Sequence, residues 1–91
     1  MWDEHRAGVL AHVSLIERAV AVLRSGELDE QLRAEAQRSA HMLSGSLGMF
    51  GFERASEAAH ELELELKRAS HARVATLSTL VSIVRRGFPA E

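Results

Sequence analysis

Hydrophobic residues recur at three- and four-residue intervals along four stretches of this chain, which is the spacing that lines one face of an α-helix. The first stretch covers residues 3–23, and the Ser25-Gly26 pair after it is a helix stop. The second begins at Leu28 or Asp29 and runs to about Gly51, which we expect to cap the helix in a left-handed conformation. The core positions predicted in these two helices are Val9, Val13, Ile16, Val20, Leu23, Leu32, Ala36, Ser39, Leu43, Leu47 and Phe50.

The second half of the chain carries two more helical stripes. The third helix is predicted from Phe52 to Lys67 or Arg68, and Ser70 is the predicted N-cap of a fourth helix that ends before Gly87. Because every predicted connection is short, consecutive helices should lie antiparallel. The pattern therefore predicts an all-α fold, an antiparallel up-down-up-down four-helix bundle that forms one domain over residues 1–91. The core positions predicted in the last two helices are Phe52, Ala55, Ala59, Leu62, Leu66, Val74, Leu77, Leu80, Val81 and Val84.

Composition narrows the classes of function that such a bundle can serve. The chain has a formal net charge of −2 and its basic residues are scattered, which argues against binding of nucleic acid. It has no cysteine, and no apolar stretch approaches the ~20 residues that cross a bilayer. We therefore expect a cytoplasmic protein with neither nucleic acid nor a membrane as its partner.

Two apolar residues, Leu64 and Ile83, fall outside the predicted stripes. They could mark a dimer contact or a surface that more chain covers, but singly exposed apolar side chains are common on any protein. We expect a monomer rather than a dimer.

One histidine stands in an unusual context within the second predicted helix. At about 100° per residue, His41 lies about 180° around the helix from Leu32 and should therefore face outward. Gly45 and Gly48 follow on the same side, although glycine costs ~1 kcal/mol relative to alanine inside a helix. We interpret the two glycines as space for another molecule to approach the imidazole.

An exposed imidazole with open surroundings suits phosphoryl transfer. Neutral imidazole is abundant near pH 7, and its ring nitrogen can attack phosphorus directly. The transfer then depends on in-line positioning and on cations that a partner can supply, so we expect no cofactor on this chain. The residues expected to support the phosphate are Arg38, Ser44 and Gln37, and those expected to meet a partner are Met42, Gly45 and Gly48.

The stretch AHMLSGSLGMFGF at residues 40–52, followed by AHELE at residues 59–63, resembles the signature of histidine-containing phosphotransfer (HPt) domains. The resemblance implies a phosphoryl carrier rather than an enzyme, with His41 as the acceptor. It also implies the partners, which are a response-regulator receiver domain, whose own site would hold Mg2+, or a histidine kinase. Many family members have lysine three residues after the active histidine, where this chain has Ser44. Arg38 is our hypothesis for a compensating charge.

Other interpretations of the same residues stay open. His60 lies in a similar local sequence, but the acidic residues that follow it would repel a phosphate, so we favour His41 as the phosphoryl acceptor. A metal site around His60 lacks the H-E-x-x-H type of ligand spacing, and we interpret the glutamates of residues 57–65 as a solvated helix face. The bundle could also be an interaction module that binds a receiver, or dimerises, without carrying phosphate.

Overall fold

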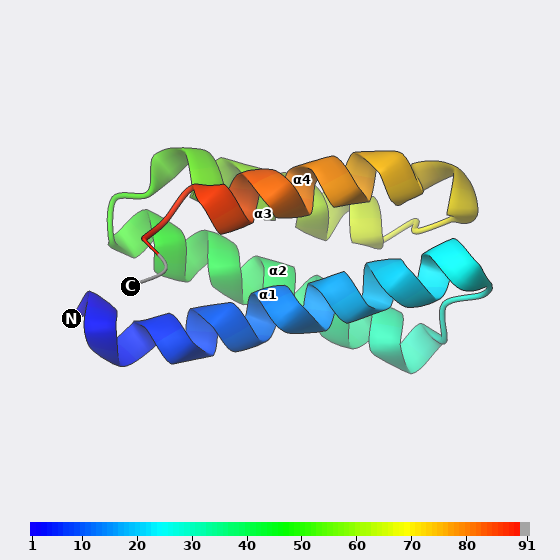
Figure 1. The fold of residues 1–91 in the computed structure, drawn as a ribbon, viewed down its shortest axis with the longest axis horizontal. Helices are drawn as coiled ribbons and strands as arrows, with labels where there is room; N and C mark the ends of the chain where they lie inside the picture. The colour runs from blue at the N-terminus through cyan, green and yellow to red at the C-terminus, as the bar shows by residue number, and fades with distance from the viewer. Residues whose placement is uncertain (90–91) are drawn as a thin grey trace.

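Four α-helices form where the hydrophobic spacing predicts them, and Figure 1 shows them side by side along one long axis. The computed structural model describes residues 1–89, so the last two residues of the predicted 1–91 domain lie outside it. Each helix packs against its neighbours in sequence, and the first also packs against the last, which confirms the all-α four-helix bundle. The helices are α1 (Trp2–Ser25), α2 (Glu30–Met49), α3 (Glu53–Leu66) and α4 (Val74–Arg86), with the short 3-10 helix η1 (His71–Arg73) before α4.

The connection between α2 and α3 is a tight turn whose geometry depends on Gly51. Gly51 has φ 83°, the only φ in the left-handed region among the described residues, and glycine reaches this region without steric cost. The N–H of Phe52 donates to the carbonyl of Leu47 at 2.9 Å, and the N–H of Gly51 donates to that of Gly48 at 3.1 Å. These two bonds form a Schellman motif, so the predicted left-handed cap is confirmed. The turn fixes how α3 returns along α2.

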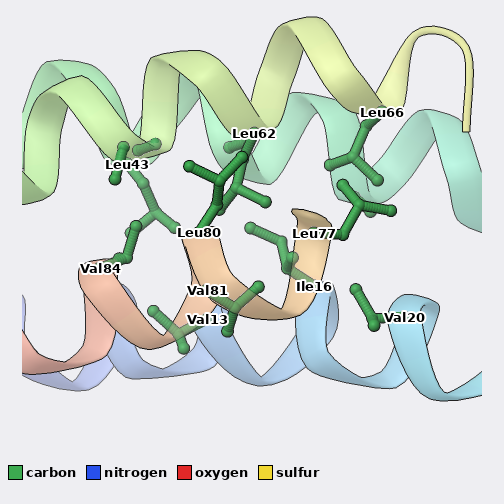
Figure 2. Close-up of a cluster of buried hydrophobic side chains, with 14 of the residues drawn as sticks. Val13, Ile16, Val20, Leu43, Leu62, Leu66, Leu77, Leu80, Val81 and Val84 are labelled. Carbon is green, nitrogen blue, oxygen red and sulfur yellow. The ribbon is translucent and has the colours of Figure 1, made fainter. Parts of the chain in front are cut away.

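The core of the bundle is made mainly of aliphatic side chains from all four helices (Figure 2), and the aromatic ring of Phe88, after α4, is buried with them. Each fully buried leucine stabilises the fold by about 1.5–3 kcal/mol relative to an exposed one. One polar residue, Ser39, is also buried, and its hydroxyl is within 2.9 Å of Nδ1 of His12 on α1, so the hydrogen bond compensates its burial. The largest fully buried side chains are Val13, Ile16, Leu43, Leu47, Leu62, Leu66, Leu77 and Val84.

Two local predictions from the sequence are wrong. Phe50 is half-buried rather than part of the core, because it follows the last turn of α2 and its ring packs edge-to-face with that of Trp2, with centroids 5.5 Å apart. Ser70 precedes η1 rather than α4, and its side chain makes no capping hydrogen bond; instead its carbonyl accepts from the N–H of Arg73 at 2.9 Å. Leu32, Phe52 and Val74 pack against the core while only partly buried.

Candidate functional site

His41 projects from the surface of α2 because its neighbours in the helix turn inward. Ala40 and Leu43 are completely buried, whereas 70 % of the His41 side chain is accessible. This exposure agrees with the orientation predicted from the helical period. An imidazole in this position can be reached by another macromolecule without any rearrangement of the bundle.

One ring nitrogen of His41 is held by a carboxylate from the neighbouring helix. Nδ1 lies 3.2 Å from Oε1 of Glu63 on α3, and the Glu63 side chain is only 16 % exposed. An ionised carboxylate can only accept a hydrogen bond, so the proton of the neutral imidazole resides on Nδ1. Nε2 then carries the free lone pair. The site therefore presents a nucleophilic nitrogen whose tautomer is set by a fixed partner.

The contact with Glu63 was not anticipated from the sequence. The solvated-face interpretation of residues 57–65 holds for Glu57 and Glu61, which are exposed, but it is wrong for Glu63 and Glu65. Glu63 turns toward α2, and Oε1 of Glu65 lies 3.3 Å from Nη1 of Arg73. Both carboxylates lie beside positively charged or hydrogen-bonding groups rather than in open solvent.

His60 approaches the same carboxylate more weakly. Its Nδ1 is 3.9 Å from Oε1 of Glu63, beyond hydrogen-bonding distance, and its side chain is 62 % exposed. It lines a groove with Ser44, Gly45, Ser56 and two further glutamates, Glu57 and Glu61. Of the two histidines, only His41 has its tautomer fixed by a hydrogen bond.

The residues predicted to support a phosphate divide between two sides of His41. Gln37 and Arg38, one turn earlier on α2, line a hollow of about 350 Å³ together with His41, Met42 and Glu63. Ser44 lies in the separate groove, and its hydroxyl donates to the carbonyl of His41 at 2.8 Å. The hydroxyl of Ser44 is therefore engaged with its own helix, while Gln37 and Arg38 share a hollow with the imidazole.

The two helical glycines near His41 have different surroundings. A Cβ added at Gly45 would meet no atom within 4 Å, so this part of the surface is open. A Cβ added at Gly48 would lie 3.1 Å from Oγ of Ser56 on α3, whose hydroxyl donates to the carbonyl of Ser44 at 2.6 Å. The close packing of α3 on α2 thus explains why residue 48 is a glycine. At Gly45 no packing within the domain requires a glycine, so the space above it is open to a partner.

Exposed methionines add apolar area to the same helix. Met42 is 55 % exposed and Met49 is 68 % exposed, so both are available to an approaching surface. Methionine side chains are flexible and polarisable, which lets them adapt to a partner. Met42 lines the same hollow as His41, whereas Met49 is the last residue of α2, two turns further along the helix.

Within residues 1–89 no three histidine, aspartate or glutamate side chains group in a way that could hold a metal ion. No helix in the part of the chain that the structure describes is long and apolar enough to cross a bilayer.

A four-helix bundle that exposes a histidine whose ring is oriented by a carboxylate has the arrangement that a small phosphoryl-carrier domain needs. The model of one protein family, the Hpt domain, matches residues 1–87, and the chain belongs to this family. Its members act in phosphorelays as histidine phosphotransfer domains, which carry phosphoryl groups and are not themselves catalytic enzymes. Neither the curated proteins nor the solved structures gave a significant match.

Proposed function

We propose that Nε2 of His41 is the atom that accepts the phosphoryl group in this Hpt domain. The observation that carries the proposal is the 3.2 Å contact between Nδ1 of His41 and the largely buried carboxylate of Glu63. With the proton held on Nδ1, the lone pair of Nε2 is exposed and ready to attack phosphorus. His60 has no comparable contact, so it is the less suitable acceptor.

The transfer follows from this protonation state. The lone pair of Nε2 forms a bond to phosphorus while the bond from phosphorus to the aspartyl oxygen of a donor receiver breaks, and that carboxylate leaves with the bonding electrons. The imidazole ring gains a positive charge, which the carboxylate of Glu63 stabilises through the Nδ1 proton. In the reverse step the positively charged ring is a good leaving group. The same geometry therefore serves both acceptance and donation, as a carrier requires.

The partners that we propose are a response-regulator receiver domain, a histidine kinase, or both. The open surface at Gly45 and the exposed side chains of Met42 and Met49 favour docking over α2. The Mg2+ that neutralises the phosphoryl oxygens would be held by the receiver, because phosphoryl transfer depends on such charge and Arg38 is the one cationic side chain among the described residues that line the hollow beside His41. We also propose that the domain works in the cytoplasm as a monomer.

A labelling experiment tests the acceptor. The purified domain is incubated with phosphorylated receivers, or with a kinase and ATP, and wild type is compared with His41→Gln and His60→Gln. Acid-labile, alkali-stable phosphate that disappears only in His41→Gln supports the proposal. Donors that bind the domain and leave the wild type unlabelled would instead make the domain an interaction module, and label lost in His60→Gln alone would move the acceptor to α3.

A further inference from the structure

The side chain of Gln37 is held in one orientation by a hydrogen-bonded arginine. Nη1 of Arg33 donates to Oε1 of Gln37 at 2.7 Å and to the carbonyl of Leu66, at the end of α3, at 3.0 Å. On its other side the same guanidinium donates to both carboxylate oxygens of Glu30, at 2.6–3.1 Å. The Arg33 side chain is only 20 % exposed. Arg33 is therefore fixed between two helices.

This arrangement determines which end of the Gln37 amide is available. A guanidinium has donors and no acceptor, so the atom that faces Arg33 must be the amide oxygen. The NH2 group of Gln37 then points away from Arg33, and within residues 1–89 neither of its protons has a hydrogen-bond acceptor. Gln37 stands one helical turn before His41 and lines the same hollow as the imidazole.

Among the described residues, no other group that lines the hollow is a neutral hydrogen-bond donor with a fixed direction. Glu63 is an acceptor and would repel phosphoryl oxygens, Met42 is apolar, and the hydroxyl of Ser44 lies in the other groove, donating to the carbonyl of His41. Arg38 brings charge, and none of the hydrogen bonds within residues 1–89 holds its side chain in place. Gln37 is thus the one neutral donor of the hollow with a fixed direction.

We propose that the side-chain N–H of Gln37 binds an oxygen of the phosphoryl group on His41, and that Arg33 is the positioning residue that orients it. The inference rests on the proposed function of His41 and deepens it. Gln37 thus supplies the hydrogen bond to the phosphoryl group that the hydroxyl of Ser44, which donates to the carbonyl of His41, does not supply. A hydrogen bond from a fixed donor to a charged oxygen stabilises phosphohistidine, and the donor loses this partner when the phosphoryl group leaves.

The chain permits a direct test because it has two glutamines, Gln31 and Gln37, and no asparagine. The 15N-labelled domain is phosphorylated with phosphoramidate, whose P–N bond breaks and releases ammonia as the Nε2–P bond forms. We expect the side-chain amide signals of Gln37 to move on phosphorylation, while those of the exposed Gln31 stay in place. In Arg33→Lys the movement should diminish, because a lysine ammonium lacks the planar guanidinium that binds Glu30 through Nε and Nη2 while Nη1 holds Gln37.

Lifetimes of phosphohistidine give a second readout. Gln37→Glu keeps the oxygen that faces Arg33 and replaces the donor by an anion, so the lifetime should fall by about five- to tenfold. Gln31→Glu makes the same chemical change on the same helix and should leave the lifetime unaltered. Glu30→Gln, at an exposed position, loosens Arg33 without altering Gln37 and should shorten the lifetime less than Gln37→Glu does.

The outcomes separate the two proposals. A wild-type domain that takes no phosphoryl group on His41 would overturn the proposed function together with this inference. Phosphorylation of His41 with stationary Gln37 signals, and with an unchanged lifetime in Gln37→Glu, would overturn the inference alone and leave His41 as the acceptor.

Discussion

Replacing Gly45 by alanine should separate the stability of the domain from its ability to receive a partner. The added methyl group meets no atom of the domain within 4 Å, so it causes no clash in the folded bundle. Alanine is more favourable than glycine inside a helix by about 1 kcal/mol. For a domain of this size the gain corresponds to a rise in Tm of about 4–8 °C.

The same methyl group lies where we place the docking surface. A methyl group inserted into a close-packed contact costs about 1–3 kcal/mol. Since about 1.4 kcal/mol is a factor of ten in rate, transfer from a phosphorylated receiver to Gly45→Ala should slow by about tenfold. Thermal unfolding followed by circular dichroism, and transfer followed by rapid quench, measure the two effects on the same preparation.

Two other glycines calibrate the measurement. Gly8 on α1 also has no atom within 4 Å of an added Cβ, so Gly8→Ala should give the full gain in stability. In Gly48→Ala the gain should be smaller, because the new Cβ lies 3.1 Å from Oγ of Ser56, and the added change Ser56→Ala should relieve this contact. A destabilised Gly45→Ala would refute the open surface at that position, and a stabilised variant with unchanged transfer would refute docking over it.

Three further predictions concern the acceptor, the core and acid pH. Glu63→Gln should slow phosphorylation by phosphoramidate about fivefold, since a partly exposed charged hydrogen bond contributes about 1 kcal/mol. Quench-flow kinetics measure this rate, and an unchanged rate would show that Glu63 does not assist the acceptor. Leu77→Ala, at a completely buried position on α4, should lower the free energy of unfolding in urea by about 2–5 kcal/mol, whereas a loss below 1 kcal/mol would contradict the packing. The hydrogen bonds from Arg33 lower the pKa of Glu30, so its contribution to stability is present above its unfolded pKa and is lost as pH falls through its folded pKa. Wild type should thus be more stable than Glu30→Gln at pH 7 and lose that advantage in acid, and a difference independent of pH would rule out this ion pair.

The features that depend on one helix at a time could be predicted from the sequence. The helical period identifies which face of each helix is buried, and it correctly turns His41 outward and Leu43 inward. The left-handed conformation of Gly51 follows from the chemistry of helix ends. Phe50 was misplaced because it lies just beyond α2, where the helical period no longer decides its direction.

The features that depend on how two helices pair could not be predicted. Glu63 was seen as one of several surface glutamates, because no pattern within α3 states which of its residues meets His41 on α2. The restraint on Gln37 likewise requires the register that brings Arg33 to the carbonyl of Leu66. Similarly, Gly48 is adjacent to Ser56 only after α3 folds back. The sequence was enough to propose His41 as the acceptor, whereas the contacts that orient its ring required the packed bundle.

The most direct test of the account is to locate the phosphorylated nitrogen. The domain is labelled with 15N-histidine, phosphorylated with phosphoramidate, and studied by long-range 1H–15N and 31P spectroscopy. The account predicts one-bond coupling between phosphorus and Nε2 of His41, with the proton on Nδ1 facing Glu63. Coupling to Nδ1 of His41, or to either nitrogen of His60, would contradict it.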